Sequence, residues 1–301
     1  MPLTQPLRVG IVGGGLMGSG IAETVARAGH DVALYEPIAE ARAGAQQRIT
    51  ASSERALAAG KLDAAAHQAL LARIRYVDEL EDLGDRELVI EAVVEDLAVK
   101  LDVFRRLDRH APADALLASN TSSIPIAALA SVVRAPERVL GLHFFSPAPV
   151  MRLVEVVCAL DTSEQTAATA TRFVESLGKT AVATKDRSGF IVNMLLIPYL
   201  VAAVRMLEEG FATREDIDSA MTLGCGHPMG PLALCDFIGL DVVCSVCDSL
   251  FEEFKKAEYA APPLLRRMLS AGRLGRKSGR GFYDYDGSDA ASSRSRNAAR
   301  N

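Results

Sequence analysis

The stretch VGIVGGGLMGSGIA, residues 9–22, decides the fold. A short apolar run comes first, a cluster of glycines follows, and the spacing of apolar residues then becomes that of a helix. Gly13, Gly15 and Gly18 form the pattern G-x-G-x-x-G between this strand and this helix. A strand before the glycines and a helix after them are the context in which the pattern binds the phosphates of a dinucleotide.

Each glycine of the pattern has its own physical role. We expect Gly13 to allow a tight turn, Gly15 to let the backbone approach a pyrophosphate, and Gly18 to let the helix pack closely on the strand. Leu16 and Met17 then begin the helix, whose first N–H groups and partial positive charge attract phosphate oxygens. The alternative, a glycine-rich turn without a ligand, does not explain the acidic residue that follows in register.

That acidic residue is Glu36, at the end of the second strand pattern, DVALYE, residues 31–36. A carboxylate about 20 residues after the glycine loop bonds the hydroxyls of the adenosine ribose. The same charge repels a 2′-phosphate, and the next residues, Pro37 and Ile38, offer no arginine to accommodate one. The sequence therefore predicts a site for NAD rather than for NADP.

Short apolar runs alternate with helical patterns through the first part of the chain. Such alternation predicts a mostly parallel sheet with helices on both faces, an α/β domain of the Rossmann type. We expect this domain to span residues 1–187 and to include a helical arm over residues 39–74, made of two helices broken near Gly60. The expected strands are residues 7–12, 31–36, 87–93, 115–119, 138–145, 153–157 and 180–184.

The pattern changes after about residue 187. From there on, helical patterns are separated by Gly or Pro without strand alternation, so residues 188–286 are expected to form an all-helical domain. The last segment, residues 287–301, consists of small and polar residues. It cannot bury enough apolar surface to order itself, and we expect a disordered tail.

Composition and charge exclude several classes of protein. The chain of 301 residues has a net charge of −5, which gives no basic field of the kind that attracts nucleic acid. No run approaches the roughly 20 apolar residues that a membrane-spanning helix needs. The N-terminus goes straight into a strand pattern without a secretion signal, so a cytoplasmic protein is expected.

All five cysteines lie in apolar surroundings. Cys244 and Cys247 form one C-x-x-C, but a zinc site would need a second pair or histidines at ligand spacing. Buried free thiols are therefore expected, and no metal site.

A second stretch, GLHFFSPAPVMRLVEVV at residues 141–157, places an ionisable pair in apolar surroundings. His143 ends one expected strand, Glu155 lies in the next, and two prolines bend the chain between them. A carboxylate bonded to the imidazole would fix its tautomer and stabilise the imidazolium, as a base for an alcohol proton requires during hydride transfer. On composition alone, a structural histidine satisfied in the core is equally expected.

The whole sequence resembles the L-3-hydroxyacyl-CoA dehydrogenase family, and most closely its single-function bacterial 3-hydroxybutyryl-CoA dehydrogenases. The resemblance runs from about residue 7 to residue 286 and implies an NAD-dependent enzyme. Its implied reaction interconverts (S)-3-hydroxyacyl-CoA and 3-oxoacyl-CoA of short chain length. The motifs that carry the resemblance are GGGLMGSGIA, VIEAVVEDLAVK, ASNTSSIPI, GLHFFSPAPVMRLVEVV, KDRSGFIVNMLLIPYL, GHPMGPLALCDFIGLD and LGRKSGRGFYDY.

The resemblance assigns the chemistry to four residues. It makes His143 the general base and Glu155 the partner that orients it. It also makes Ser122 a hydrogen-bonding group at the substrate oxygen or the nicotinamide region, and Asn193 a contact to the substrate oxygen. From the residues alone, Ser122 could merely cap a helix that begins near Ile124. An amide inside an apolar helix, as at Asn193, needs a partner.

The resemblance also implies contacts to the cofactor and to CoA. Glu95 and Lys100 are implied beside the ribose on the nicotinamide side, and Lys277 near the cofactor. Ser52 and Lys61 lie in the segment that the family uses as an arm over CoA. From the residues alone, these three lysines are ordinary solvated side chains on the surface.

Two features depart from the family pattern. Ser146 stands where the family usually has asparagine, three residues after the base, at a position that contacts the cofactor, so the nicotinamide contacts are expected to differ. The arm around residues 54–63, ERALAAGKLD, is poorer in lysine than many relatives. The contacts to the phosphates of CoA are therefore expected to differ as well.

Three functions remain open from the sequence. The first is the acyl-CoA reaction above. The second keeps the fold but acts on a hydroxyacyl group held by a carrier protein, which a basic rim of Arg55, Lys61 and Arg73 would meet, or on a sugar acid. The third is a non-catalytic NAD-binding or crystallin-like protein, against which the intact catalytic set argues. The second domain has helices that are apolar on more than one face, which together with the resemblance predicts a homodimer through this domain.

Overall fold

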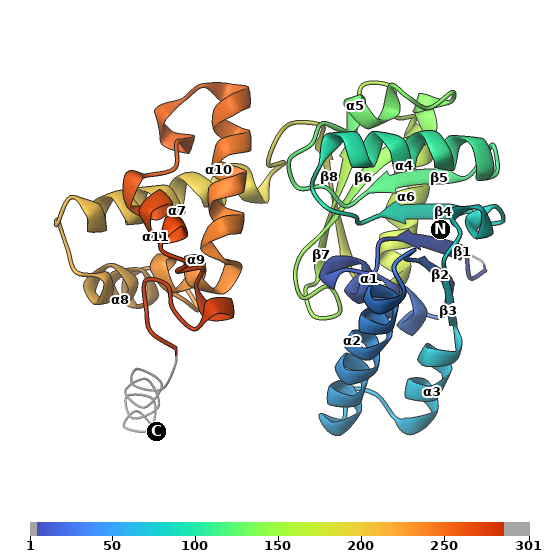
Figure 1. The fold of residues 1–301 in the computed structure, drawn as a ribbon, viewed down its shortest axis with the longest axis horizontal. Coiled ribbons are helices and arrows are strands. Elements are labelled where there is room, and N and C mark those ends of the chain that lie inside the picture. The colour runs from blue at the N-terminus through green and yellow to red at the C-terminus, as the bar shows by residue number, and fades with distance from the viewer. Residues whose placement is uncertain (1–4, 286–301) are drawn as a thin grey trace. The chain divides into compact units, whose positions relative to one another are not determined.

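The computed structural model describes residues 5–285, and the chain divides into two compact units between Phe190 and Ile191. Within residues 5–285, the first unit holds all eight strands, and the second is built from helices (Figure 1). Both parts of the predicted fold class are thereby confirmed. The predicted tail, residues 287–301, lies outside the described residues.

The first unit is built on one sheet with the strand order β3-β2-β1-β4-β5-β6-β7-β8. Every neighbouring pair is parallel except β6 and β7, which run antiparallel. The short strand β3 is not among the expected strands, because it follows the helical arm directly. The strands are β1 (Arg8–Val12), β2 (Asp31–Tyr35), β3 (Ile74–Val77), β4 (Leu88–Glu91), β5 (Leu116–Ser119), β6 (Val139–Phe144), β7 (Leu153–Cys158) and β8 (Thr180–Lys185).

Helices cover both faces of this sheet. Val9 and Ile11 of β1 point into one apolar core, whereas their neighbour Val12 points into the other. Because both faces are buried, the central strands are continuous apolar runs rather than alternating ones. The first core is closed by α1 (Leu16–Arg27), α2 (Ala39–Ala58), α3 (Ala64–Ala72) and α6 (Glu164–Ser176). The second is closed by α4 (Leu97–His110) and α5 (Ile126–Ala130).

The predicted arm is present as α2 and α3, which pack on each other and on α1 (Figure 1). The break falls at Gly60, whose φ of +67° favours glycine, as the sequence predicted. Asp63 then starts α3, because its carboxylate accepts the backbone N–H of Ala66 at 2.7 Å.

The second unit has one apolar core formed mainly by four helices that pack on one another, α7, α9, α10 and α11. Glycine or proline lies at or next to the start of several of these helices, in keeping with the sequence pattern. No helix within residues 5–285 is long and apolar enough to span a membrane. The helices are α7 (Val192–Glu208), α8 (Arg214–Gly224), α9 (Pro231–Ile238), α10 (Leu240–Phe254) and α11 (Pro263–Ser270).

Two buried aspartates hold this unit together. Asp218 of α8 accepts two backbone N–H groups in the first turn of α9, at 2.8 and 2.9 Å. Asp236 of α9 accepts the N–H groups of Phe282 and Tyr283, both at 2.9 Å. A Cβ at Gly281 would lie 1.9 Å from an oxygen of Asp236, so only glycine fits there. The motif GRGFYDY therefore has a structural role as the strap that closes the helical unit.

Candidate active site

Polar side chains gather at one edge of the sheet in the first unit. Because β1, β2, β4, β5 and β6 are parallel, their carboxyl ends meet at this edge. In open α/β sheets, ligands bind outside the carboxyl ends of the strands. The residues that end or follow these strands are the glycine loop, Glu36, Glu91, Ser119 and His143.

The geometry of the glycine loop fits a dinucleotide. Gly13 has a φ of +106°, and a Cβ on it would lie 2.7 Å from the carbonyl oxygen of Ala92. A Cβ on Gly18 would lie 1.9 Å from the carbonyl oxygen of Gly13. At Gly15, by contrast, none of the described atoms lies within 4 Å of the Cβ position. Two glycines are thus forced by the fold itself, whereas the third leaves open space at the start of α1, next to the exposed Leu16.

Glu36 supports this loop from the side. One carboxylate oxygen accepts the N–H of Gly14 at 2.9 Å, and the other accepts the N–H of Ile38 at 3.2 Å. The two residues after Glu36 offer no arginine, as the sequence analysis noted, but a residue further along the chain does. Arg42 of α2 donates from Nη1 to the main-chain oxygen of Glu36 at 2.7 Å. The first turn of α2 folds Arg42 back onto the end of β2, a contact that lies beyond the two residues after Glu36.

His143 and Glu155 meet, as their strands predicted. They stand directly opposite each other in the antiparallel pair of β6 and β7. His143 Nδ1 lies 2.7 Å from Glu155 Oε2. The side chain of Glu155 is completely buried and that of His143 is 8% exposed. With Nδ1 engaged, Nε2 is the ring nitrogen that remains to exchange a proton.

Two aromatic rings enclose the imidazole of His143. The ring centroid of Phe145 lies 4.5 Å from it, and that of Phe190 lies 5.4 Å from it. Phe190 has a φ of +49°, an uncommon conformation for a residue with a side chain. Such apolar walls lower the local dielectric and strengthen the hydrogen bond between the imidazole and Glu155.

A second ionic cluster lies at the end of β4. Lys100 of α4 is 1% exposed, and its Nζ lies 2.6 Å from Glu91 and 3.2 Å from Glu95. Glu91 is completely buried and also accepts the hydroxyl of Ser119 at 2.6 Å and the N–H of Val93 at 2.7 Å. The interpretation of Lys100 as a surface lysine is therefore wrong, and Glu91 is a site residue that the sequence analysis missed.

Glu95 connects this cluster to the loop that carries Ser122. Its carboxylate accepts the hydroxyl of Thr121 at 2.5 Å, the N–H of Ser122 at 3.0 Å and the hydroxyl of Ser123 at 3.1 Å. Burial by itself raises the pKa of Glu95, but the Lys100 ammonium and the hydrogen bonds from Thr121 and Ser122 outweigh it and hold that pKa below its usual range. The ionised carboxylate thus fixes the loop after β5.

Ser122 does not cap the helix that follows. Helix α5 begins at Ile126, and no side chain at its N-cap position, Pro125, makes a capping bond. The carboxylate of Asp186 takes this role instead, because it accepts the N–H groups of Ile126 and Ala127 at 2.9 and 2.7 Å. The alternative interpretation of Ser122 as a helix cap is therefore wrong. Its hydroxyl lies in a partly exposed loop and is available to a ligand.

A cavity of about 210 Å³ lies between the glycine loop, the arm and the segment after His143. Ser52 and Ser146, both predicted as ligand contacts, line it together with Leu16, Arg48 and Arg55. The cavity also reaches a buried acid on α1, Glu23, to which Ser52 is hydrogen-bonded. Lys61 lies in the turn between α2 and α3 and is exposed. It is not among the described residues that line this cavity.

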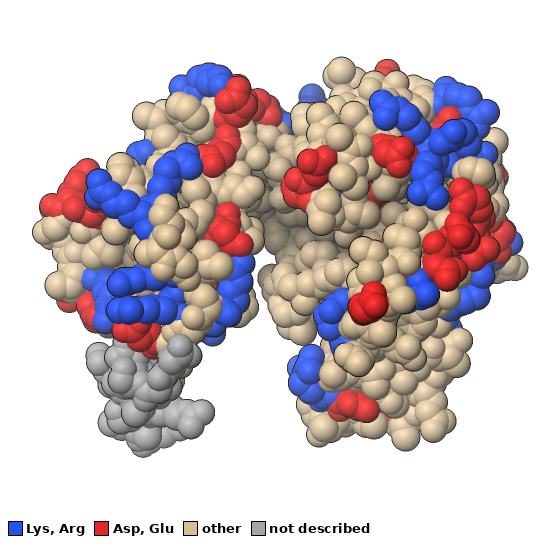
Figure 2. All heavy atoms as spheres, viewed as in Figure 1, with Lys and Arg blue, Asp and Glu red and all other residues tan. Residues whose placement is uncertain are grey.

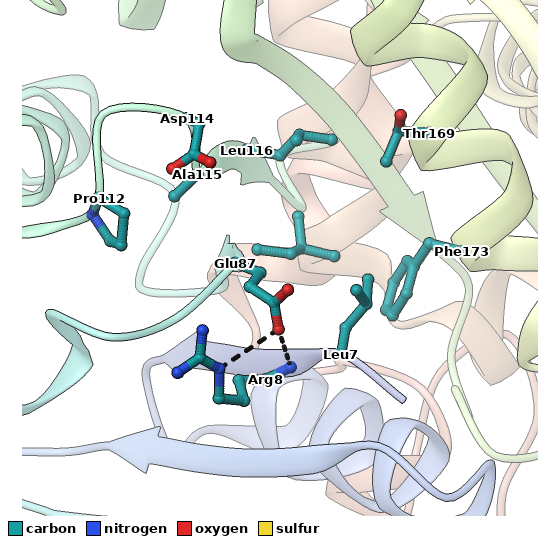
Figure 3. Close-up of a pocket in the computed structure, with 10 residues that line it drawn as sticks. Leu7, Arg8, Glu87, Pro112, Asp114, Ala115, Leu116, Thr169 and Phe173 are labelled. Atoms are coloured by element: carbon teal, nitrogen blue, oxygen red, sulfur yellow. Dashed lines mark hydrogen bonds and ion pairs between the residues drawn. The ribbon is translucent and has the colours of Figure 1, made fainter. Parts of the chain in front are cut away.

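Another cavity, of about 280 Å³, lies at the amino ends of the strands, on the edge opposite His143. Leu7, Leu116 and Phe173 form its apolar wall (Figure 3). Arg8 and Glu87, which face it, pair with each other at 3.3 Å. Their charges are mutually satisfied and the predicted site residues lie at the other edge, so this cavity does not belong to the candidate site.

The two remaining predicted residues lie in the helical unit. Asn193 is partly buried in the first turn of α7. Lys277 lies in a short 3-10 helix, Arg276–Ser278, and its Nζ pairs with Asp241 of α10 at 2.5 Å. Lys277 therefore has an ionic partner within its own unit, which the sequence alone did not reveal.

The fold and the glycine loop define a class, the dehydrogenases that use a nicotinamide dinucleotide. Family models make the class specific. The model described as 3-hydroxyacyl-CoA dehydrogenase, NAD binding domain, matches residues 8–187, and the model of the C-terminal domain of the same family matches residues 189–285. The chain belongs to the 3-hydroxyacyl-CoA dehydrogenase family, and its cofactor is NAD.

Individual proteins agree with the family models. A 3-hydroxybutyryl-CoA dehydrogenase of Mycobacterium tuberculosis is 54% identical over 280 residues, which is 92% of this chain and 98% of that protein. The human mitochondrial hydroxyacyl-coenzyme A dehydrogenase is 40% identical over 286 residues, covering 92% of this chain and 90% of that protein. The crystal structure of FadB2 from M. tuberculosis matches with a TM-score of 0.92 and 53% identity, over 93% of this chain and all 100% of that one.

Proposed function

We propose that this protein interconverts (S)-3-hydroxybutyryl-CoA and acetoacetyl-CoA with NAD. The relative from M. tuberculosis, 54% identical over 280 residues, is named for the 3-hydroxybutyryl-CoA reaction. A solved relative from Ralstonia eutropha, 40% identical with a TM-score of 0.89, is named for its (S) form. Similarity of this extent over nearly the whole chain supports the same substrate class for this protein.

The observation that carries the proposal is the buried hydrogen bond of 2.7 Å between His143 and Glu155. Bound NAD supplies the acceptor for the hydride that leaves the alcohol carbon. His143 takes the hydroxyl proton at Nε2, while Nδ1 stays bonded to Glu155, whose negative charge stabilises the imidazolium. In the reverse direction, Nε2 returns this proton to the oxo oxygen of the substrate.

Ser122 is the residue that we propose to hold the substrate oxygen from the side of the sheet. Its loop is fixed by the bond from its N–H to Glu95 at 3.0 Å, so its hydroxyl is pre-positioned. Asn193, in the first turn of α7, stays a prediction as a second contact to that oxygen. We assign dinucleotide binding to residues 1–187, and substrate binding together with dimerisation to residues 188–286.

The dinucleotide would be held by the loop after β1 and by Glu36. The open space at Gly15 and the N–H groups at the start of α1 suit its phosphates, next to Leu16 and Met17. Glu36 suits the hydroxyls of the adenosine ribose. Lys100 is buried against Glu91, and we propose that it acts on the cofactor through Glu95 rather than by direct contact.

The CoA handle should supply much of the substrate binding, because a four-carbon acyl group offers few apolar atoms. We propose that it lies along the arm, with Ser52 facing the cavity beside Arg48 and Arg55. Ser52→Ala and Lys61→Ala should each raise the KM for acetoacetyl-CoA and leave the KM for NADH unchanged. A change in the KM for NADH alone would contradict the arm assignment.

The direct test follows the near-ultraviolet absorbance of NADH with acetoacetyl-CoA as substrate. Rapid oxidation of NADH supports the proposal, and free acetoacetate should be a very poor substrate because binding energy from CoA orients the reacting carbon. Turnover of a carrier-bound acyl group alone would favour the carrier-protein function. NADH binding without any turnover would favour a non-catalytic protein.

We also propose a homodimer through the helical unit, in the cytoplasm. Five cysteines that are all free thiols suit a reducing compartment. Several large apolar side chains of the helical unit are exposed and would be covered in a dimer. Sedimentation equilibrium at micromolar concentration should give a dimer, and a stable monomer would contradict this. The exposed residues are Leu195, Met206, Phe211, Leu223, Phe237, Val242 and Phe251.

A further inference from the structure

A positively charged side chain lies beside Glu36, the residue assigned to the 2′ position of the adenosine ribose, where NADP carries a phosphate and NAD does not. Arg42 donates from Nη1 to the main-chain oxygen of Glu36 at 2.7 Å. Glu36 ends the second strand pattern, and the acid at this place bonds the 2′-hydroxyl of the adenosine ribose. In NADP-binding sheets, a nearby arginine accommodates the 2′-phosphate instead. This chain therefore holds both the acid and an arginine at the same corner of the fold.

The anchor of Arg42 is independent of the charge on Glu36. The bond goes to the main-chain oxygen, so a change of the Glu36 side chain leaves it in place. The remaining charged partner of Arg42 that the structure records is Asp78, at 3.4 Å, whose side chain is 64% exposed. A solvent-exposed ion pair of this length contributes little, so the guanidinium can exchange Asp78 for a phosphate at small cost.

We propose that Arg42 is a latent ligand for a 2′-phosphate, kept from binding one by the carboxylate of Glu36. The chain then discriminates between the dinucleotides through repulsion by one residue rather than through the lack of a phosphate site. The ligand class is that of 2′-phosphorylated adenosine nucleotides. The proposal rests on the NAD site at the glycine loop and on no property of the acyl substrate.

The test measures the binding of nucleotides that fill only the adenosine end. Isothermal titration calorimetry with 2′,5′-ADP and 5′-AMP gives the affinity of each without any turnover. The key variant is Glu36→Gln, because an amide oxygen can still accept the N–H of Gly14, now at 2.9 Å from the carboxylate. The variant removes the charge and keeps this bond to the loop, while the longer bond from the N–H of Ile38, at 3.2 Å, is lost.

We expect Glu36→Gln to bind 2′,5′-ADP roughly tenfold tighter than the wild type, as one charge-assisted hydrogen bond allows. Its affinity for 5′-AMP should change by a few fold at most. In that background, Arg42→Ala should remove most of the gain. The matched control is Arg75→Ala, on the neighbouring strand β3, where an exposed arginine bonds the main-chain oxygen of Asp82 at 3.3 Å and not Glu36. That control should keep the gain.

Two results would overturn the proposal. One is unchanged binding of 2′,5′-ADP by Glu36→Gln while 5′-AMP still binds. The other is an equal gain with and without Arg42. If Glu36→Gln does not fold, Glu36→Ala takes its place, because it also removes the charge and leaves the main-chain oxygen that holds Arg42. It should bind 2′,5′-ADP tighter relative to 5′-AMP than the wild type does, and the absence of such a gain, or a gain that Arg42→Ala does not remove, would overturn the proposal.

The experiments distinguish failure of the proposed acyl-CoA reaction from failure of the proposal for Arg42. A protein that does not turn over acetoacetyl-CoA but shows the expected nucleotide affinities would refute the proposed reaction and leave the role of Arg42 intact. A protein that reduces acetoacetyl-CoA with NADH, but whose nucleotide affinities do not respond to Arg42, would do the opposite.

Discussion

Glu155 and Glu91 are both completely buried carboxylates of the same sheet, yet their partners differ in kind. Glu155 lies in the middle of β7 and meets the imidazole of His143 at 2.7 Å. Glu91 ends β4 and meets the ammonium of Lys100 and the hydroxyl of Ser119, both at 2.6 Å. The partner, rather than the burial of the acid, decides what each cluster can do.

An imidazole changes its charge near neutral pH and keeps a second nitrogen for a ligand. The ammonium of Lys100 is already paired with two carboxylates, and at 1% exposure it has no surface left for a ligand. In the proposed mechanism, a buried carboxylate therefore serves proton transfer at β7, whereas the one at β4 serves as a fixed scaffold. The two clusters should respond to mutation in opposite ways, one in catalysis and the other in stability.

The largest effect should come from Lys100→Met. This change leaves Glu91 buried without a cation, and the removal of one member of a buried ion pair costs about 3–5 kcal/mol. Urea denaturation followed by circular dichroism should show a loss of this size. Lys256→Met is the matched control, because the side chain of Lys256 is 64% exposed and its partner Glu258 lies 3.9 Å away.

The control should change stability by less than about 1 kcal/mol. Adding Glu91→Gln to Lys100→Met should recover part of the loss, because it removes the unpaired charge. A Lys100→Met protein as stable as the control would mean that the cluster is not a scaffold, and the contrast between the two carboxylates would fail.

The second effect concerns catalysis. His143→Gln should lower kcat by roughly a hundredfold or more, the usual contribution of a positioned acid–base group. NADH binding should persist, measured by the fluorescence of the bound nucleotide. A near-normal kcat would exclude His143 as the base, whereas loss of NADH binding would give it a structural role.

Glu155→Gln should have the third largest effect. It keeps the shape of the side chain but removes the charge that supports the imidazolium, so kcat should fall by roughly tenfold to a hundredfold, the equivalent of one charge-assisted hydrogen bond. The comparison is sharpened by Glu91→Gln, which should change stability more than kcat. If Glu155→Gln lost stability but kept kcat, both carboxylates would be scaffolds.

Local patterns in the sequence were sufficient for the fold class. The glycine spacing and the alternation of strands and helices depend on neighbours in the chain, and both are confirmed by the sheet and by the family. Strand β3 was missed because four residues, IRYV, with two of them buried, carry little periodicity. The contact of His143 with Glu155 followed from the pairing of adjacent strands, and the structure has it.

The sequence analysis did not predict the contacts between residues that lie far apart in the chain, although the sequence contains evidence for two of them. Lys100 lies three, four and seven residues before the buried Val103, Phe104 and Leu107, so helical spacing puts it on the inner face of α4. Glu91 interrupts an apolar strand, which a buried acid does only with a partner. Arg42 lies close to Glu36 because of the direction in which α2 leaves the end of β2. The composition of the sequence does not give that direction.

The smallest effect should be the pH dependence that Glu95 gives to stability. Burial raises the pKa of Glu95, but Lys100 and two hydrogen bonds outweigh it and hold this pKa in the folded protein below its usual range. A carboxyl with a lowered folded pKa stabilises the protein above its unfolded pKa, and this contribution is lost as pH falls through the folded value. The melting temperatures of the wild type and Glu95→Gln should therefore differ at neutral pH and converge as pH falls through the lowered pKa of Glu95. The difference should be modest, since the side chain of Glu95 is 35% exposed and partly screened by solvent.

The control for this prediction is Glu258→Gln. The side chain of Glu258 is 53% exposed and its ion pair with Lys256 is 3.9 Å long, so the melting temperatures of this variant and the wild type should show no such convergence. A difference between wild type and Glu95→Gln that grows in acid would mean that Lys100 does not hold Glu95 ionised, and the cluster at β4 would not be the fixed scaffold that the comparison assigns to it.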